Sequence, residues 1–121
     1  MSTPNVLLLL TDQQQSSTIA PESPCSTPNV DRLAAEGTRF SRCYASNPIC
    51  SPSRASLLTG VLPHEHGMVD CTHTVPPYRA RFRTSLPTWS ESLADAGYYL
   101  GYVGKWHIER SRRLETFGFD E

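Results

Sequence analysis

The amino-acid sequence predicts an α/β fold, with a mixed and mostly parallel sheet flanked by helices. A continuous aliphatic run at residues 6–10 has the composition of a strand buried on both faces. Segments with apolar residues at helical spacing alternate with shorter extended segments along the rest of the chain. The 121 residues are enough for one small domain, and the formal charge of −1 gives no electrostatic reason to expect nucleic acid as a partner.

The first expected elements lie before residue 46. Residues 5–11 form the predicted buried strand, and Asp12 follows at its carboxyl end. Ligands gather at that edge of open α/β sheets, so Asp12 either serves a functional site or caps a turn or helix. After a loop, Pro28 begins a short amphipathic helix that Gly37 ends. Residues 38–45 alternate in polarity and predict a strand or an extended edge.

The second helix is expected directly after Cys50. Ser51 is the predicted N-cap, Pro52 suits the first helical position, and Gly60 ends the apolar pattern. Residues 61–85 sustain no period and contain several prolines, which predicts a long loop.

The last expected elements are a helix and a strand. The helix follows Pro87, has capping-box spacing between Thr88 and Glu91, and ends at Gly97. Residues 98–103 are aromatic and aliphatic and predict a strand that leads into residues 104–107.

The N-terminal segment gives no indication of a membrane partner. Its aliphatic run is far too short to cross a bilayer, and residues 1–5 lack the basic flank of a secretory signal. We therefore expect a cytoplasmic protein, or a mature form.

The cysteines are expected to be thiols rather than disulfides, because their spacing contains no C-x-x-C pair. They are Cys25, Cys43, Cys50 and Cys71. A small redox protein in which Cys50 pairs with Cys43 or another cysteine remains an alternative. A zinc site is also conceivable but has no recognised ligand spacing; it would use Cys43, Cys50, His64 and His66.

Cys50 has a distinctive position at the expected start of a helix. Unpaired backbone N–H groups and the positive end of the helix dipole favour an anion or a thiolate there, and Arg54 adds a fixed positive charge. A reactive thiolate, an anion pocket and a small buried residue are all compatible with this position.

Residues 50–60 resemble the signature of the type I sulfatases, C-x-P-x-R followed by L-x-T-G. Five further segments are similar to the family in the same order: 5–12, 27–34, 63–67, 96–98 and 104–107. The resemblance implies the alkaline-phosphatase-like fold of the sulfatases, with residues 1–121 as the amino-terminal part of a catalytic domain. It also implies a hydrolase of sulfuric esters.

In this family a maturation enzyme oxidises the signature cysteine to formylglycine, whose hydrated aldehyde is the nucleophile. The resemblance therefore identifies Cys50 as the precursor of formylglycine. One hydrate oxygen would attack sulfur with loss of the alcohol. Deprotonation of the second hydroxyl would then expel sulfate and regenerate the aldehyde.

The resemblance also implies roles for other residues. Asp12 and the modified Cys50 would bind a divalent cation, calcium first and magnesium or manganese as alternatives. Arg54 would contact the nucleophile or the metal-ligating acids. Lys105 and His107, one residue apart in an expected extended segment, would act in catalysis and bind the sulfate. Further metal ligands would come from beyond Glu121.

One departure from the family widens the range of substrates. Many sulfatases carry two adjacent acids after the first strand, whereas Gln13 follows Asp12 here and is expected to bind substrate without adding charge. A sulfate ester or a sulfated sugar is the expected substrate. A phosphonate monoester or phosphodiester hydrolase and a catalytically silent fragment of the fold are the alternatives. Arginines at alternate positions of residues 79–83 form either a basic rim for polyanionic sugars or solvated loop charge.

Overall fold

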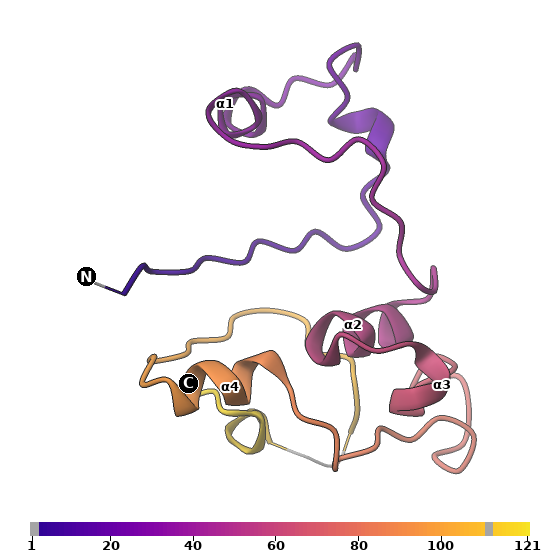
Figure 1. The fold of residues 1–121 in the computed structure, drawn as a ribbon. Helices are drawn as coiled ribbons and strands as arrows, with labels where there is room; N and C mark the ends of the chain where they lie inside the picture. The colour runs from indigo at the N-terminus through magenta and orange to yellow at the C-terminus, as the bar shows by residue number, and fades with distance from the viewer. Residues whose placement is uncertain (1–2, 111–112) are drawn as a thin grey trace. The chain divides into compact units, whose positions relative to one another are not determined.

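The computed structural model describes residues 3–110 and 113–121 and divides the chain into two units, residues 1–43 and 44–121. Figure 1 shows the helical elements, which are η1 (Ser16–Thr18), α1 (Pro28–Glu36), α2 (Cys50–Thr59), α3 (Pro63–His66), α4 (Trp89–Asp95) and η2 (Leu114–Phe117). None of the helices in the described part of the chain has the length and apolar character needed to span a membrane.

The first unit contains η1 and α1. Helix α1 begins at Pro28 and Gly37 is its C-cap, which confirms the predicted helix and both of its ends. An ion pair of 3.0 Å between Arg32 and Glu36 joins neighbouring turns on its surface. No residue in the range 3–43 is buried, so the first unit has no core of its own.

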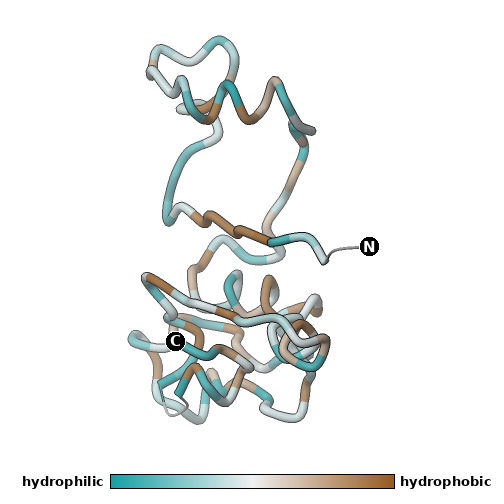
Figure 2. Tube along the Cα trace, turned by 90° about the vertical axis from the view of Figure 1, so that its left-hand side faces the viewer, coloured by the Kyte–Doolittle hydropathy of each residue, from teal (hydrophilic) through white to brown (hydrophobic). Residues whose placement is uncertain are grey.

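The predicted buried strand at residues 5–11 is an extended but exposed segment. Its aliphatic side chains at positions 6–10 are between 52% and 82% exposed. Figure 2 shows this run as a brown stretch close to the amino terminus. The described residues contain no β-strand, here or at residues 38–45 and 98–103, so the predicted sheet is not confirmed. A backbone segment becomes a strand only where a neighbour pairs with it.

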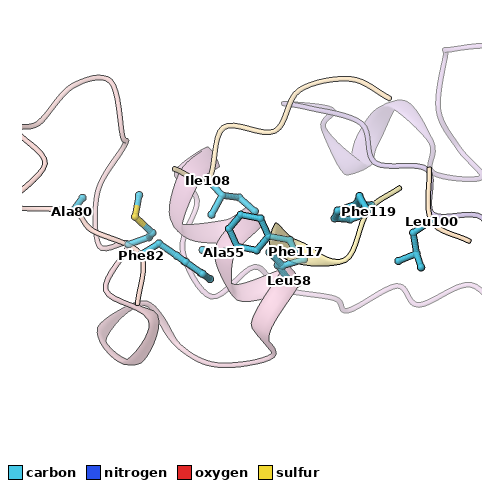
Figure 3. Packing of buried hydrophobic residues seen from close by; sticks show 9 residues of the cluster. Ala55, Leu58, Ala80, Phe82, Leu100, Ile108, Phe117 and Phe119 are labelled. Carbon is cyan, nitrogen blue, oxygen red and sulfur yellow. The ribbon is translucent and has the colours of Figure 1, made fainter. Parts of the chain in front are cut away.

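The second unit is built around an aromatic and aliphatic core (Figure 3). Phe117 lies at its centre, with ring centroids 5.8 Å from Phe82 and 4.9 Å from Trp106. Helix α2 contributes Ala55 and Leu58 to this core. The remaining buried apolar residues are Met68, Ala80, Leu100, Ile108 and Phe119. The core therefore joins α2 to the loop after α3 and to the C-terminal segment.

Helix α2 begins two residues earlier than predicted. Cys50 is its first residue, Ile49 is the N-cap, and the predicted cap Ser51 is a fully buried residue of the first turn. The Ser51 side chain contacts the loop around residue 71 instead of capping the helix. Gly60 ends the helix in the left-handed conformation, at φ 74°, as predicted.

Helices α3 and α4 both pack against α2. The predicted capping box of α4 is confirmed, because Glu91 N–H donates to the Thr88 hydroxyl and Thr88 N–H donates to the Glu91 carboxylate. The short helix α3 lies inside the segment predicted to be loop and ends at Gly67.

Residues 98–103 run beside the C-terminal residues. Asp120 N–H donates to the Leu100 carbonyl at 2.8 Å, and Tyr102 N–H donates to the Glu121 carbonyl at 2.7 Å. The strand predicted at residues 98–103 is not confirmed, because these two hydrogen bonds do not make a strand pair.

Candidate active site

The candidate site begins at the first residue of α2. Cys50 is half-buried there, and the helix is established from its first turn by a 3.0 Å bond from Ser53 N–H to the Ile49 carbonyl. The sequence predicted this cysteine at the edge of the helix, and the structure places it within the first turn. Cys50 therefore belongs to the turn whose backbone N–H groups have no intrahelical partner.

Two side chains far away in sequence gather around Cys50. The Cys71 sulfur lies 4.0 Å from the Cys50 sulfur and 3.7 Å from His107 Nε2. The two sulfurs and one ring nitrogen of His107 all lie within 4.8 Å of one another. All four cysteines of the chain are free thiols, as predicted. We refer to Cys50, Cys71 and His107, together with His73, as the thiol–histidine cluster.

His73 joins the cluster through His107. His73 Nδ1 lies 2.6 Å from His107 Nε2, with ring centroids 4.5 Å apart. No role in the hydrolase site was predicted for Cys71 or His73, because both belong to a loop without periodicity. The only signal available was the C-x-H spacing of Cys71 and His73, which places two ligand-type side chains close together.

Ser51 holds the loop that carries Cys71. Its hydroxyl accepts a hydrogen bond from the Thr72 N–H at 3.2 Å. The same hydroxyl donates to the Cys71 sulfur at 4.0 Å. A hydrogen bond from the backbone of His73 is the main cause that lowers the pKa of Cys71, and hydrogen bonds from nearby side chains add to it while burial opposes it. The loop geometry thus stabilises the thiolate form of Cys71.

Arg54 lies one turn after Cys50 and bonds to the backbone of residue 105. Its guanidinium donates to the Lys105 carbonyl at 2.5 Å, and the Tyr102 hydroxyl donates to the same oxygen at 2.7 Å. Arg54 therefore fixes the segment that carries His107 against α2.

The segment with Lys105 and His107 is not the regular extended strand that the sequence suggested. His107 has φ 54°, in the left-handed region that a non-glycine residue adopts at a cost of about 1–3 kcal/mol. Lys105 is exposed, and His107 is half-buried in the cluster. The structure thus brings His107 to Cys50.

Asp12 and Gln13 lie in the first unit at the end of the aliphatic run. Both side chains are exposed, and Gln13 has φ 30°, which turns the chain there. Their carboxylate and amide oxygens are donors of the type that calcium and magnesium take.

His66 has a structural role. It is fully buried, its Nδ1 accepts the Met68 N–H at 3.1 Å, and its Nε2 lies 2.9 Å from the Ser56 hydroxyl. Burial is the main cause that lowers its pKa. Both ring nitrogens of His66 thus have protein partners, so His66 is not available as the zinc ligand considered from the sequence.

A cleft of about 550 Å³ is lined in part by residues that follow members of the cluster in the sequence. Its lining includes Thr72, which follows Cys71, and Glu109 and Arg110, which follow His107 by two and three residues. Arg81 also lines this cleft, while its neighbours Ala80 and Phe82 are buried. The alternation seen in the sequence is therefore that of a segment with one buried face, and Arg81 gives the cleft a positive charge.

The geometry and the signature agree with what comparison with known proteins finds. The family model described as Sulfatase matches residues 4–121. N-acetylgalactosamine-6-sulfatase of Homo sapiens is 40% identical over 128 residues, which cover 98% of this chain and 24% of that protein. N-acetylglucosamine-6-O-sulfatase of Bacteroides thetaiotaomicron is 38% identical and covers 97% of this chain and 19% of that protein.

A solved structure is similar as well. The crystal structure of yidJ from Bacteroides fragilis, described as a sulfatase, is 38% identical and superimposes with a TM-score of 0.63 over 74% of this chain and 19% of that chain. The chain belongs to the sulfatase family. The family match and the solved structure support an alkaline-phosphatase-like fold, of which this chain is the amino-terminal portion. The chain spans about a fifth to a quarter of the length of these curated relatives.

Proposed function

We propose that this chain provides the nucleophile part of a sulfuric ester hydrolase, with Cys50 as the precursor of formylglycine. The observation that carries the proposal is the position of Cys50 at the first turn of α2, beside His107 and inside the full signature of residues 50–60. A sulfate ester is anionic, so its reaction requires positive charge and hydrogen-bond donors around sulfur. A formylglycine-generating maturation enzyme is the partner that this proposal requires.

The residues of the chain would divide the work as follows. The N–H groups of the first turn of α2 would hold an anionic group. Arg54 would keep residues 105–107 against α2, so that His107 stays next to position 50. The Lys105 ammonium would bind the sulfate, and His107 would bind it or move a proton at the leaving oxygen.

The donor set of the first unit fits the divalent cation expected in this family. Asp12 and Gln13 offer a carboxylate and an amide oxygen, whereas the thiol of Cys50 is a poor ligand for calcium until its sulfur is replaced by oxygen. Asp12 would hold the cation, with magnesium and manganese as alternatives. The cation would polarise the sulfuryl group, and formylglycine would supply an oxygen nucleophile.

A sulfated sugar is the substrate class we propose, because two of the named relatives are sulfatases of amino sugars. The cleft is lined by Arg81 and Arg110 and by one acid, Glu109, and the excess of positive charge would favour such an anionic substrate. Gln13 in place of a second acid keeps a phosphonate monoester or phosphodiester hydrolase as the second candidate.

The test compares hydrolysis of aryl sulfates, sulfated amino sugars, phosphonate monoesters and phosphodiesters by protein from its native host. Cys50→Ala should abolish hydrolysis, and the matched variant Cys43→Ala at an exposed cysteine should leave it intact. Equal activity of the two variants would contradict the role of Cys50. Activity confined to phosphorus esters would select the second candidate, and a total lack of hydrolysis would indicate a silent member of the fold.

A further inference from the structure

The thiol–histidine cluster has a donor chemistry that the hydrolase proposal does not use. Two sulfurs and one imidazole nitrogen meet at one place, contributed by the start of α2, the loop at residue 71 and the segment at residue 107. His73 Nδ1 lies 2.6 Å from that nitrogen. Calcium and magnesium prefer oxygen ligands, whereas thiolate and imidazole select zinc and other soft or borderline cations. We propose that the chain, while Cys50 is still a thiol, binds one Zn²⁺ ion through Cys50, Cys71 and His107, with His73 moving in as the fourth ligand.

The two distances from the Cys71 sulfur, to the Cys50 sulfur and to His107 Nε2, lie near those of a tetrahedral zinc site. Zn–S bonds of about 2.3 Å and Zn–N bonds of about 2.0–2.1 Å separate the ligand atoms by about 3.3–3.8 Å. The Cys50–Cys71 sulfur distance is 4.0 Å, and the Cys71 sulfur lies 3.7 Å from His107 Nε2. Both separations need to shorten by only a few tenths of an ångström.

The two histidines require a larger adjustment. His73 Nδ1 and His107 Nε2 are 2.6 Å apart, so an ion between them would have to move them apart by about 0.7 Å to reach tetrahedral spacing. His73 is exposed, which leaves it room for this movement. His107 is held more firmly, because Arg54 and Tyr102 both bond to the carbonyl of residue 105.

The loop that carries Cys71 is also held in place. Ser51, the residue after Cys50, is fully buried and bonds to the Thr72 N–H and to the Cys71 sulfur. Outer contacts of this kind orient metal ligands before the ion arrives. The contacts of Ser51 therefore keep the Cys71 sulfur close to the Cys50 sulfur before a zinc ion binds.

The proposed zinc site would exist only before maturation. Formation of formylglycine replaces the sulfur of Cys50 by oxygen and removes one of the four ligands. Conversely, a zinc-bound thiolate at position 50 would not be accessible to the maturation enzyme. Zinc binding and formylglycine formation are thus mutually exclusive states of one residue, and the zinc site does not depend on the hydrolysis of any ester.

The test uses the full chain made by cell-free translation without a maturation enzyme, with mass spectrometry to establish that Cys50 is a thiol. Anaerobic titration with Co²⁺ should give one equivalent bound, with thiolate-to-cobalt charge-transfer absorption that Zn²⁺ removes. Cys71→Ser should weaken Co²⁺ binding by more than about 100-fold, since loss of an outer contact alone costs about 10–100-fold. The matched controls Cys43→Ser and His64→Ala should bind as the unchanged chain does.

A second measurement needs no variant and so does not depend on the folding of Cys71→Ser. Zinc should slow alkylation of Cys50 and Cys71 by iodoacetamide and leave Cys25 and Cys43 unaffected, as read from the labelled peptides. The proposal is overturned by cobalt binding without thiolate absorption, by equal effects of Cys71→Ser and Cys43→Ser, or by uniform alkylation. A Cys50–Cys71 disulfide that persists in the presence of zinc would overturn it too. These readouts concern the thiol form alone, so their failure is distinct from a failure of sulfatase activity.

Discussion

Replacing Gly67 by alanine should destabilise the loop that carries Cys71. Gly67 has φ 82° at the end of α3, and a Cβ there would overlap the Arg81 carbonyl oxygen. The backbone around it is paired through Arg81 N–H to the Gly67 carbonyl at 3.3 Å and Arg83 N–H to the His66 carbonyl at 2.9 Å. Alanine would have to adopt a left-handed conformation. It would also push apart the two backbone segments that these hydrogen bonds join.

The magnitude follows from these two effects. The left-handed conformation costs about 1–2 kcal/mol for a residue with a Cβ. Each backbone hydrogen bond that breaks costs about 0.5–1.5 kcal/mol. We therefore expect Gly67→Ala to lower the free energy of unfolding by about 2–5 kcal/mol.

Gly97→Ala is the matched control, because Gly97 has φ 84° but no atom lies within 4 Å of its added Cβ. That variant should lose only the conformational part, about 1–2 kcal/mol. Urea denaturation followed by circular dichroism measures both variants, with the midpoint compared at equal slope. If Gly67→Ala loses no more stability than Gly97→Ala, the close packing of residue 67 against the Arg81 carbonyl is contradicted.

Two further predictions concern buried polar groups. Burial lowers the pKa of His66 in the folded state, so the unfolded chain binds a proton more readily. The contribution of His66 to the free energy of unfolding is fully present above the pKa of histidine in the unfolded chain. It should fall as the pH drops below about 6.5, by at most about 1.4 kcal/mol per pH unit. Denaturation midpoints from pH 8 to pH 5 test this; His66→Gln should flatten the profile and the exposed control His64→Gln should not. Thr88→Ala should cost about 0.5–2 kcal/mol, since it removes the hydroxyl that accepts the Glu91 N–H, and thermal unfolding that leaves Tm unchanged would contradict it.

The helices were predictable from the sequence because their ends carry local signals. Gly37 and Gly60 end α1 and α2 at the expected positions, and the capping box at Thr88 and Glu91 begins α4. These contacts span at most four residues along the chain. The helix α3 was missed because its four residues are too few to establish a period.

The strands and the cluster depend on distant contacts, and the sequence was less informative there. The aliphatic run at residues 6–10 predicts a strand, but a strand is defined by its partner, and the described residues contain no such pair. Cys50 and Arg54 were found through the signature. Cys71 joins Cys50 only through the fold of a loop 21 residues away, and no local pattern encodes that approach.

The measurement that tests the central claim most directly is the chemical state of Cys50. Protein purified from its native host would be digested, and the peptide containing Cys50 fragmented by mass spectrometry. The proposed function predicts that position 50 is the lighter formylglycine aldehyde. A pool in which position 50 is entirely an unmodified cysteine would contradict the hydrolase mechanism, while leaving the zinc site of the thiol form to be decided by its own titration.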